Sequence, residues 1–436
     1  MPVDSLMKHG RLVSLSLLVP AISAGLVVAA AASTANQTPA ARQEAVPGTT
    51  TEQSDARAAL RAARNACVAA PTRDCALTVA LRTVAEEDLA IERAKVLIAV
   101  AESLAHVGDM GIARRTLRLG LEEAESIGIS VATDAQLAGA APVYAMLGSD
   151  DAALRTSRRI EDAVLRDRSL GDVVRALGTA GKADLAVAAL DTIDQPVVRL
   201  LATIDAAEAA LAAGWITPAR AFADKVPDFL DPALARSVRL QVEARLSAVQ
   251  ARLGAVEPAR TELIRLVDEV EAVSFSADKA RVLAAVARAW LALEDDAGYD
   301  RAIRRATAFA RRVRSDTDRE VAVHDVALAR AAAGDVSGAV EELGGIDDLR
   351  SRSRAIQALA VLPLSNQARG ELADFIEGSL SLSNGSDSSF ERDLARYRAV
   401  TALTELGQVA AAVRVIDSIE DDDTQAQAFG YLARAL

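Results

Sequence analysis

Residues that could carry out chemistry are sparse in this chain, and their spacing forms no familiar catalytic arrangement. The stretch from Gly178 to Gly181 lacks the lysine and serine that complete a phosphate-binding loop. Beyond the first residues of the chain the histidines are His106 and His324, too far apart for a zinc motif. No serine stands in a Gly-x-Ser-x-Gly pattern. We therefore predict that the protein is not an enzyme and uses no metal and no cofactor.

Cys67 and Cys75 are the only cysteines, and they bracket a short turn. Pro71 ends the first of two helices, and Thr72 can cap the second. If the chain is exported, the pair predicts a disulfide that closes a nine-residue loop. Such a loop stabilises a fold by roughly 2 to 3 kcal/mol. Two buried free thiols are the alternative. We expect the bridge to hold a terminal repeat that lacks a neighbour.

Charged clusters in the sequence favour solvated helix faces and helix caps over binding sites. Acidic runs at 294–296 and 421–423 could ligate calcium, but at helix starts such runs are usually caps. The arginines at 311, 312 and 314, and those at 158 and 159, are followed by acidic residues that cancel them. The whole chain has a net charge of −12. This balance disfavours nucleic acid and anionic membrane surfaces as partners.

The elements that would position any site repeat along the chain. Seven glycines each have an alanine five residues later; they are Gly108, Gly148, Gly181, Gly214, Gly254, Gly334 and Gly407. Fifteen residues before six of these glycines stands an arginine: Arg93, Arg166, Arg199, Arg239, Arg319 and Arg392. A glycine ends a helix in the left-handed conformation, and a small residue lets the next helix pack closely. The pattern predicts helical hairpins, with the arginine bonding the preceding hairpin.

These hairpins resemble the tetratricopeptide repeat, from about Ala58 to Leu436. The resemblance implies an all-α fold, a right-handed superhelical α-solenoid of antiparallel helix hairpins. The glycine spacings are 40, 33, 33, 40, 80 and 73 residues, and the aromatic positions of the family are mostly aliphatic. A generic α-solenoid is therefore the alternative. In the irregular unit after Gly254 we place the turn at Ala297-Gly298 and the small residue at Ala302.

The resemblance also implies a concave groove lined by the first helix of each hairpin. Its ligand-facing positions fall on Lys95, Glu102, Arg168, Arg175, Glu208, Gln241, Arg252, His324 and Tyr397. Their mixed charge suits a protein or peptide partner, held in an extended conformation by side-chain hydrogen bonds. Ordinary solvated positions on a helix face are the alternative.

Three segments are expected along the chain. Residues 1–35 form a signal peptide with a basic start, an apolar stretch and a small-residue cleavage site. An uncleaved anchor in the inner membrane is the alternative, since the apolar stretch could span a bilayer. Residues 36–55 form a flexible linker, and residues 56–436 form the helical repeat domain without a further membrane span. We expect the last segment, 421–436, to be half a hairpin that caps the solenoid toward solvent.

These features predict a periplasmic or envelope scaffold that binds protein or peptide partners along its groove. Two alternatives remain. One is the helical domain of an envelope glycan-acting enzyme, which would need a separate catalytic domain. The other is a purely structural spacer.

Overall fold

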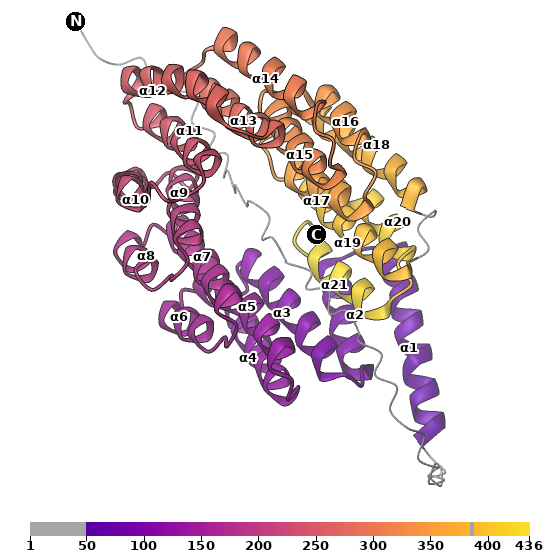
Figure 1. Ribbon diagram of the computed structural model, residues 1–436. Helices are drawn as coiled ribbons and strands as arrows, with labels where there is room; N and C mark the ends of the chain where they lie inside the picture. Colours follow the sequence, from indigo (N-terminus) through magenta and orange to yellow (C-terminus); the bar gives the residue numbers. More distant parts are fainter. Residues whose placement is uncertain (1–48, 384–387) are drawn as a thin grey trace, which may run out of the picture.

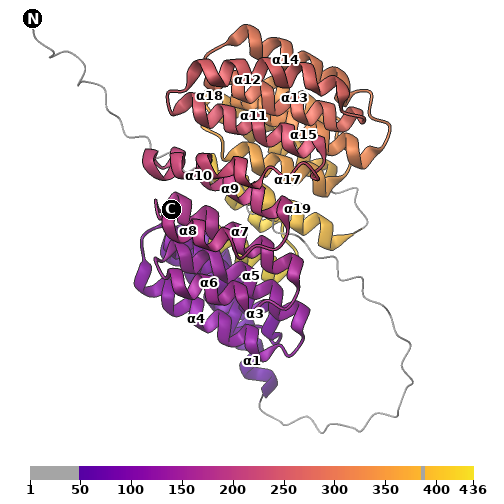
Figure 2. The same ribbon diagram turned by 60° about the vertical axis from the view of Figure 1, so that its left-hand side comes forward.

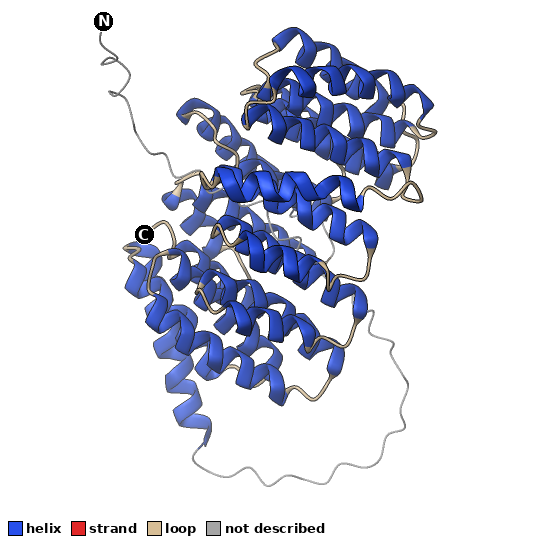
Figure 3. Cartoon of the chain, turned by 90° about the vertical axis from the view of Figure 1, so that its left-hand side faces the viewer, coloured by secondary structure: helices blue, strands red, loops and turns tan. Residues whose placement is uncertain are grey.

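The computed structural model describes residues 49–383 and 388–436, and this part of the chain consists of helices and loops without a strand (Figure 3). The signal peptide and most of the linker lie outside the described residues. The first helix, α1 (Thr49–Ala69), begins within the segment predicted as linker. No described helix is both long and apolar enough to cross a membrane.

The helices form two layers that follow the chain around a ring (Figures 1 and 2). The inner layer contains α3 (Ala90–His106), α5 (Ser130–Met146), α7 (Ala163–Thr179), α9 (Pro196–Ala212), α11 (Arg236–Arg252), α13 (Ser276–Ala292), α15 (Asp316–Ala332), α17 (Leu349–Ala360), α19 (Ser389–Glu405) and α21 (Asp422–Leu432). Each of these helices packs against the next one in this order.

The outer layer packs against one side of the inner layer. It contains α2 (Arg73–Glu86), α4 (Met110–Ser126), α6 (Asp150–Arg158), α8 (Ala183–Leu190), α10 (Ile216–Phe229), α12 (Val256–Glu269), α14 (Asp296–Ala310), α16 (Val336–Gly344), α18 (Asn366–Ser383) and α20 (Val409–Asp417). A short 3-10 turn, η1 (Val270–Ala272), follows α12.

The repeated glycines and alanines take the positions that their spacing predicts. All seven glycines have positive φ, from +71° at Gly148 to +96° at Gly254, and each ends an inner helix. All seven alanines that follow are fully buried in outer helices. Glycine adopts this conformation at no steric cost, and the buried alanines let the two layers approach closely.

The irregular unit departs from our prediction. Its turn is at Glu294, which has a φ of +54°, and not at Ala297-Gly298. Gly298 lies inside α14 instead, where an added Cβ would be 2.5 Å from Cδ2 of Trp290. Ala302 is buried in the same helix. Gly298 therefore makes room for the Trp290 indole from the inner layer.

The first and last inner helices of the described chain, α3 and α21, meet and close the ring. The helix α21 packs against α19 on one side and α3 on the other, and α2 covers it as its outer helix (Figure 1). A Cβ on Gly430 would lie 3.1 Å from Cγ2 of Val100, so the helices touch here. Arg73 Nε donates to the carbonyl of Ala433 at 3.3 Å. The tenth hairpin of the ring thus combines the last helix with a helix from the start.

Our expectation of a solvent-facing cap at 421–436 is wrong. Phe429 and Leu432 are fully buried, because the first repeat supplies the neighbours that a cap would lack. The predicted disulfide between Cys67 and Cys75 is present, with the Cα atoms 5.5 Å apart. It joins α1 to α2 and does not hold an isolated repeat, since α2 packs against α21 and α3. Thr72 caps α2 as predicted.

Three of the six repeated arginines, Arg93, Arg199 and Arg239, bond the preceding loop as predicted. Arg166 and Arg392 instead pair with Asp194 and Glu420 in the loop that follows, and Arg319 pairs with Asp316 in its own first turn. Arg93 Nη1 donates to the carbonyls of Glu87 and Asp88, both at 2.9 Å. Arg199 and Arg352 each donate to the isoleucine carbonyl six residues before them. These bonds satisfy backbone carbonyls that the turn leaves without helical partners.

Buried aspartates support the same turns from the neighbouring inner helix. Asp134 accepts hydrogen bonds from the backbone N–H groups of Glu161 and Asp162. Asp393 accepts from those of Glu420 and Asp421 in the same way. A carboxylate beside the first turn of the next inner helix accepts from N–H groups that have no helical partner. Its negative charge also interacts favourably with the helix dipole. These bonds fix α7 relative to α5 and α21 relative to α19.

Candidate functional site

The side of the inner helices that the outer layer leaves uncovered is the candidate site, and we call it the inner face. Residues thirteen, nine, six and two before the turn glycine share this side, because their spacing matches helical periodicity. On α11 they are Gln241, Arg245, Ala248 and Arg252. All four are half-buried or exposed, whereas their neighbours Leu240, Ala244 and Ala251 are buried. Solvent therefore reaches the inner face.

All nine residues predicted to line the groove lie on inner helices. Lys95 and Glu102 are on α3, Arg168 and Arg175 on α7, Glu208 on α9, Gln241 and Arg252 on α11, His324 on α15, and Tyr397 on α19. Arg168 and Arg252 are exposed, and the others are half-buried. The structure distributes them around the ring and does not gather them into a single pocket.

Arg245 connects two of the inner helices and was missed in the sequence. Its guanidinium on α11 lies 2.5 Å from Oδ1 of Asp205 and 2.6 Å from Oε2 of Glu208, both on α9. Burial alone would lower the pKa of Arg245, but the two carboxylates outweigh it and raise that pKa. The same pairing lowers the pKa of Glu208 against the effect of burial. Glu208, a predicted groove residue, is thus held by a partner within the protein.

A second charged group stands where the ring closes. Arg434 Nη2 lies 2.9 Å from Oε1 of Glu102, in an ion pair without hydrogen-bond geometry. The Arg434 guanidinium also lies 3.8 Å from the ring centroid of Tyr431, whose hydroxyl donates to Glu405 at 2.5 Å. Burial raises the pKa of Glu102, but Arg434 together with His106 and Arg175 outweighs it, so that pKa is lowered. Glu102 therefore belongs to the contacts that close the ring.

Other predicted residues also have partners within the chain. Lys95 Nζ donates to Oε1 of Glu92 at 2.7 Å. Arg175 Nη2 donates to Oδ1 of Asp172 at 2.7 Å. Burial raises the pKa of Tyr397 to about 12 and lowers that of His324. His324 is therefore neutral at pH 7 and can donate or accept a hydrogen bond.

Several arginines on the inner face have no acidic partner among the described residues. They are Arg168, Arg252, Arg288, Arg354 and Arg398, and the last three were not predicted. Arg288 stands six residues before Glu294, and Glu102, Arg175 and Glu208 stand at the same distance before their turn glycines. Placing the turn at Gly298 hid this register. The inward acids Glu102, Asp172, Asp205, Glu208 and Asp325 are paired with arginines, and Glu405, two residues before Gly407, accepts from the Tyr431 hydroxyl.

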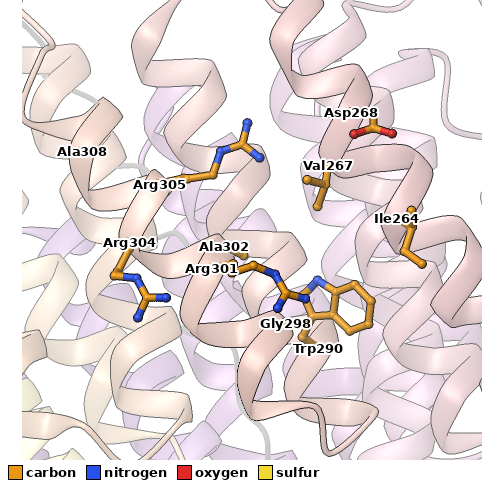
Figure 4. Close-up of a pocket in the computed structure, with 10 residues that line it drawn as sticks. All are labelled: Ile264, Val267, Asp268, Trp290, Gly298, Arg301, Ala302, Arg304, Arg305 and Ala308. Carbon is orange, nitrogen blue, oxygen red and sulfur yellow. The ribbon is translucent and has the colours of Figure 1, made fainter.

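A hollow of about 510 Å³ lies on the outer layer's side of the ring, between α12, α13 and α14 (Figure 4). Ile264, Val267 and Trp290 provide apolar surface, and Arg301 extends toward the indole. Of the other two arginines, Arg305 is paired with Glu271 and Arg304 with Asp300. The hollow is open to solvent, and two of its three arginines are paired with acidic residues. It is therefore a weaker candidate for a binding site than the inner face.

Comparisons with known proteins do not assign this chain to a family. No family model matches it, and no curated protein matches it. Among solved structures, Ton1535 from Thermococcus onnurineus NA1 is similar with 12% identity and a TM-score of 0.23, over 75% of this chain and 98% of that one. A circular tandem repeat protein is similar with 14% identity and a TM-score of 0.22, over 88% of each chain. At these TM-scores neither similarity supports a conclusion about fold or function.

Proposed function

We propose that this protein is a periplasmic scaffold that holds an extended segment of a partner protein against the inner face of its ring. The observation that carries the proposal is the arginine surplus of the inner face. In a chain with a net charge of −12, five inner-face arginines have no acidic partner in the described part, while five inward acids are paired. Unpaired guanidinium groups offer several donors in a fixed geometry to a ligand.

The proposal keeps the tetratricopeptide-like interpretation, with hairpins arranged in a right-handed sense and export by a cleaved signal peptide. The disulfide between Cys67 and Cys75 supports export, because structural disulfides persist in oxidising compartments. The closed ring adds a restriction on the partner. A segment on the inner face must enter the ring, since helices surround that face on all sides.

Site-specific photo-crosslinking in the native cell tests the proposal. A crosslinking amino acid replaces Ala248 or Ala285, which are half-buried on the inner face, or Thr261, which is exposed on the outer helix α12. We expect the two inner positions to trap the same protein and Thr261 to trap none. Arg168→Glu combined with Arg252→Glu should abolish the adduct without unfolding the chain, since neither side chain has a partner in the described structure. Equal trapping at Thr261, or no adduct at the inner positions, would reject the scaffold.

A further inference from the structure

Three of the unpaired arginines lie on one arc of the ring, and we call them the arginine cluster: Arg288 on α13, Arg354 on α17 and Arg398 on α19. His324 on α15 lies between them, and its pKa is lowered by burial and by the charges of Arg354, Arg281 and Arg288. Arg354 acts on Arg398 in the same way. Four successive inner helices, each packed against the next, therefore carry these polar side chains along one arc of the inner face.

Arg398 is the most constrained member of the cluster. It is only 4% exposed, yet it makes no ion pair with a described residue. Its Nη1 donates to the carbonyl of Arg350 at 2.9 Å and to Oγ of Ser353 at 3.1 Å. Burial, followed by the charges of Arg354 and Arg350, lowers the pKa of Arg398 to about 10. The side chain is thus a charged, held group at pH 7 in surroundings that disfavour its charge.

The nearby acidic groups are already occupied. Asp325 accepts from Nε of Arg281 at 2.9 Å. Glu391 lies 3.4 Å from Arg350. Asp348 caps α17 by accepting from the N–H of Ser351 at 2.7 Å. None of these carboxylates forms an ion pair with a member of the cluster. A buried cation is stabilised by a paired anion, and here the protein does not supply one.

We propose that the arginine cluster binds carboxylate side chains of an acidic segment in the partner protein. This inference rests on the proposed scaffold function and specifies the chemistry of its ligand. Guanidinium groups on α13, α17 and α19 can each form paired hydrogen bonds with a carboxylate. Ser353 and Arg350 hold Arg398 in advance, so little side-chain freedom is lost on binding.

A protein segment fits the inner face better than a uniformly charged polymer does. Elsewhere around the ring the inner face carries the carboxylates of Glu102, Asp172, Asp205 and Glu208. A polyphosphate or sulfated glycan is charged along its whole length, and beside these carboxylates its charges would find the arginines already occupied. A peptide can place its acidic residues at the cluster and neutral or basic residues elsewhere.

Fluorescence anisotropy with the full mature chain tests this inference. The probe is a fluorescein-labelled peptide of alternating glutamate and serine, and the reference probe has glutamine in place of glutamate. We expect binding of the acidic probe only, weakened at least tenfold by combining Arg288→Gln with Arg354→Gln. Neither side chain has a hydrogen bond or ion pair with a described residue, so the fold should persist, as circular dichroism can verify. Arg118→Gln on the outer helix α4, where the side chain is 67% exposed, is the matched control.

Each result decides the inference separately from the scaffold function. Equal binding of both probes, or equal affinity of the double variant and wild type, would overturn it. Binding of inorganic polyphosphate but not of the acidic peptide would overturn it in favour of a polyanion. If the peptide fails while inner-face crosslinking still traps a partner, the scaffold stands and only the acidic nature of its ligand is rejected. If crosslinking fails too, both proposals fall.

Discussion

Arg352 and Gln425 occupy the same position in two hairpins and make the same contact with different groups. Arg352 Nε donates to the carbonyl of Ile346 at 2.7 Å. Gln425 Nε2 donates to the carbonyl of Ile419, six residues before it, at 3.3 Å. The position therefore requires a donor that reaches back into the loop, and a positive charge is not essential. Arginines elsewhere on the same helices, such as Arg354, lack such a partner and are available to a ligand.

Removing one of these donors should destabilise the fold. Arg352 is 8% exposed, and Arg352→Ala would leave the Ile346 carbonyl without its partner. We expect a loss of about 2 kcal/mol in the free energy of unfolding, measured by urea denaturation. Arg118→Ala, on an exposed outer face, should change it by less than about 0.5 kcal/mol. A similar loss for both variants would argue against the loop contact as the cause.

The pH dependence of stability should reveal Asp423 at the start of α21. Burial, then the charges of Glu87, Glu92 and Asp421, raise the pKa of Asp423 to about 7. Of these groups, Glu92 is neutralised by Lys95. The folded chain binds the Asp423 proton more tightly than the unfolded chain does. Stability from this group therefore falls as the pH rises from about 4 to about 7.

Asp423→Asn should remove that component and increase stability at pH 8. Thermal unfolding of wild type and variant across pH 4 to 8 measures the difference. Asp347→Asn, at an exposed loop position, is the control and should leave the profile unchanged. A wild-type profile that Asp423→Asn does not alter would show that Asp423 titrates normally.

At the scale of the helix, two glycines in outer helices should respond in opposite ways to the same substitution. In α14 a Cβ on Gly298 would lie 2.5 Å from Cδ2 of Trp290, so Gly298→Ala should cost about 1 to 3 kcal/mol through overpacking. In α18 a Cβ on Gly370 would meet nothing within 4 Å. Gly370→Ala should therefore stabilise the protein by about 0.5 to 1 kcal/mol, since alanine favours helix. Calorimetry on both variants measures the pair, and equal signs would contradict the packing at Trp290.

The hairpins could be predicted from the sequence because their determinants are local. A turn glycine and the alanine after it are five residues apart, and both conform to the pattern in seven units. The turn at Glu294 could not be predicted, because a glutamate in the left-handed conformation has no sequence signal. Because we placed that turn at Ala297-Gly298, the register did not identify Arg288 as an inner-face residue. Arg245 and Arg398 could not be assigned partners either, because their contacts join different hairpins.

At the scale of the whole molecule, ring closure depends on the last helix. Deleting residues 421–436 should expose the faces of α2, α3 and α19 that now contact α21. We expect hydrogen exchange in α2 and α3 to become faster, although they are far from the deletion in sequence, while α9 to α13 keep their protection. Small-angle X-ray scattering should show a more extended particle. Unchanged exchange in α2 and α3 would contradict closure.

The pairing of α2 with α21 also means that the order of the helices around the ring need not be their order in the gene. The side chain of Arg73, at the start of α2, already touches the carbonyl of Ala433, near the end of the chain. A short linker from Leu436 to the start of α2 would make this hairpin continuous like the other nine. New ends could then be opened at the loop before α3, giving a circular permutant that lacks α1 and keeps all ten hairpins. For such a ring, the beginning and the end of the polypeptide are a matter of where the circle is cut.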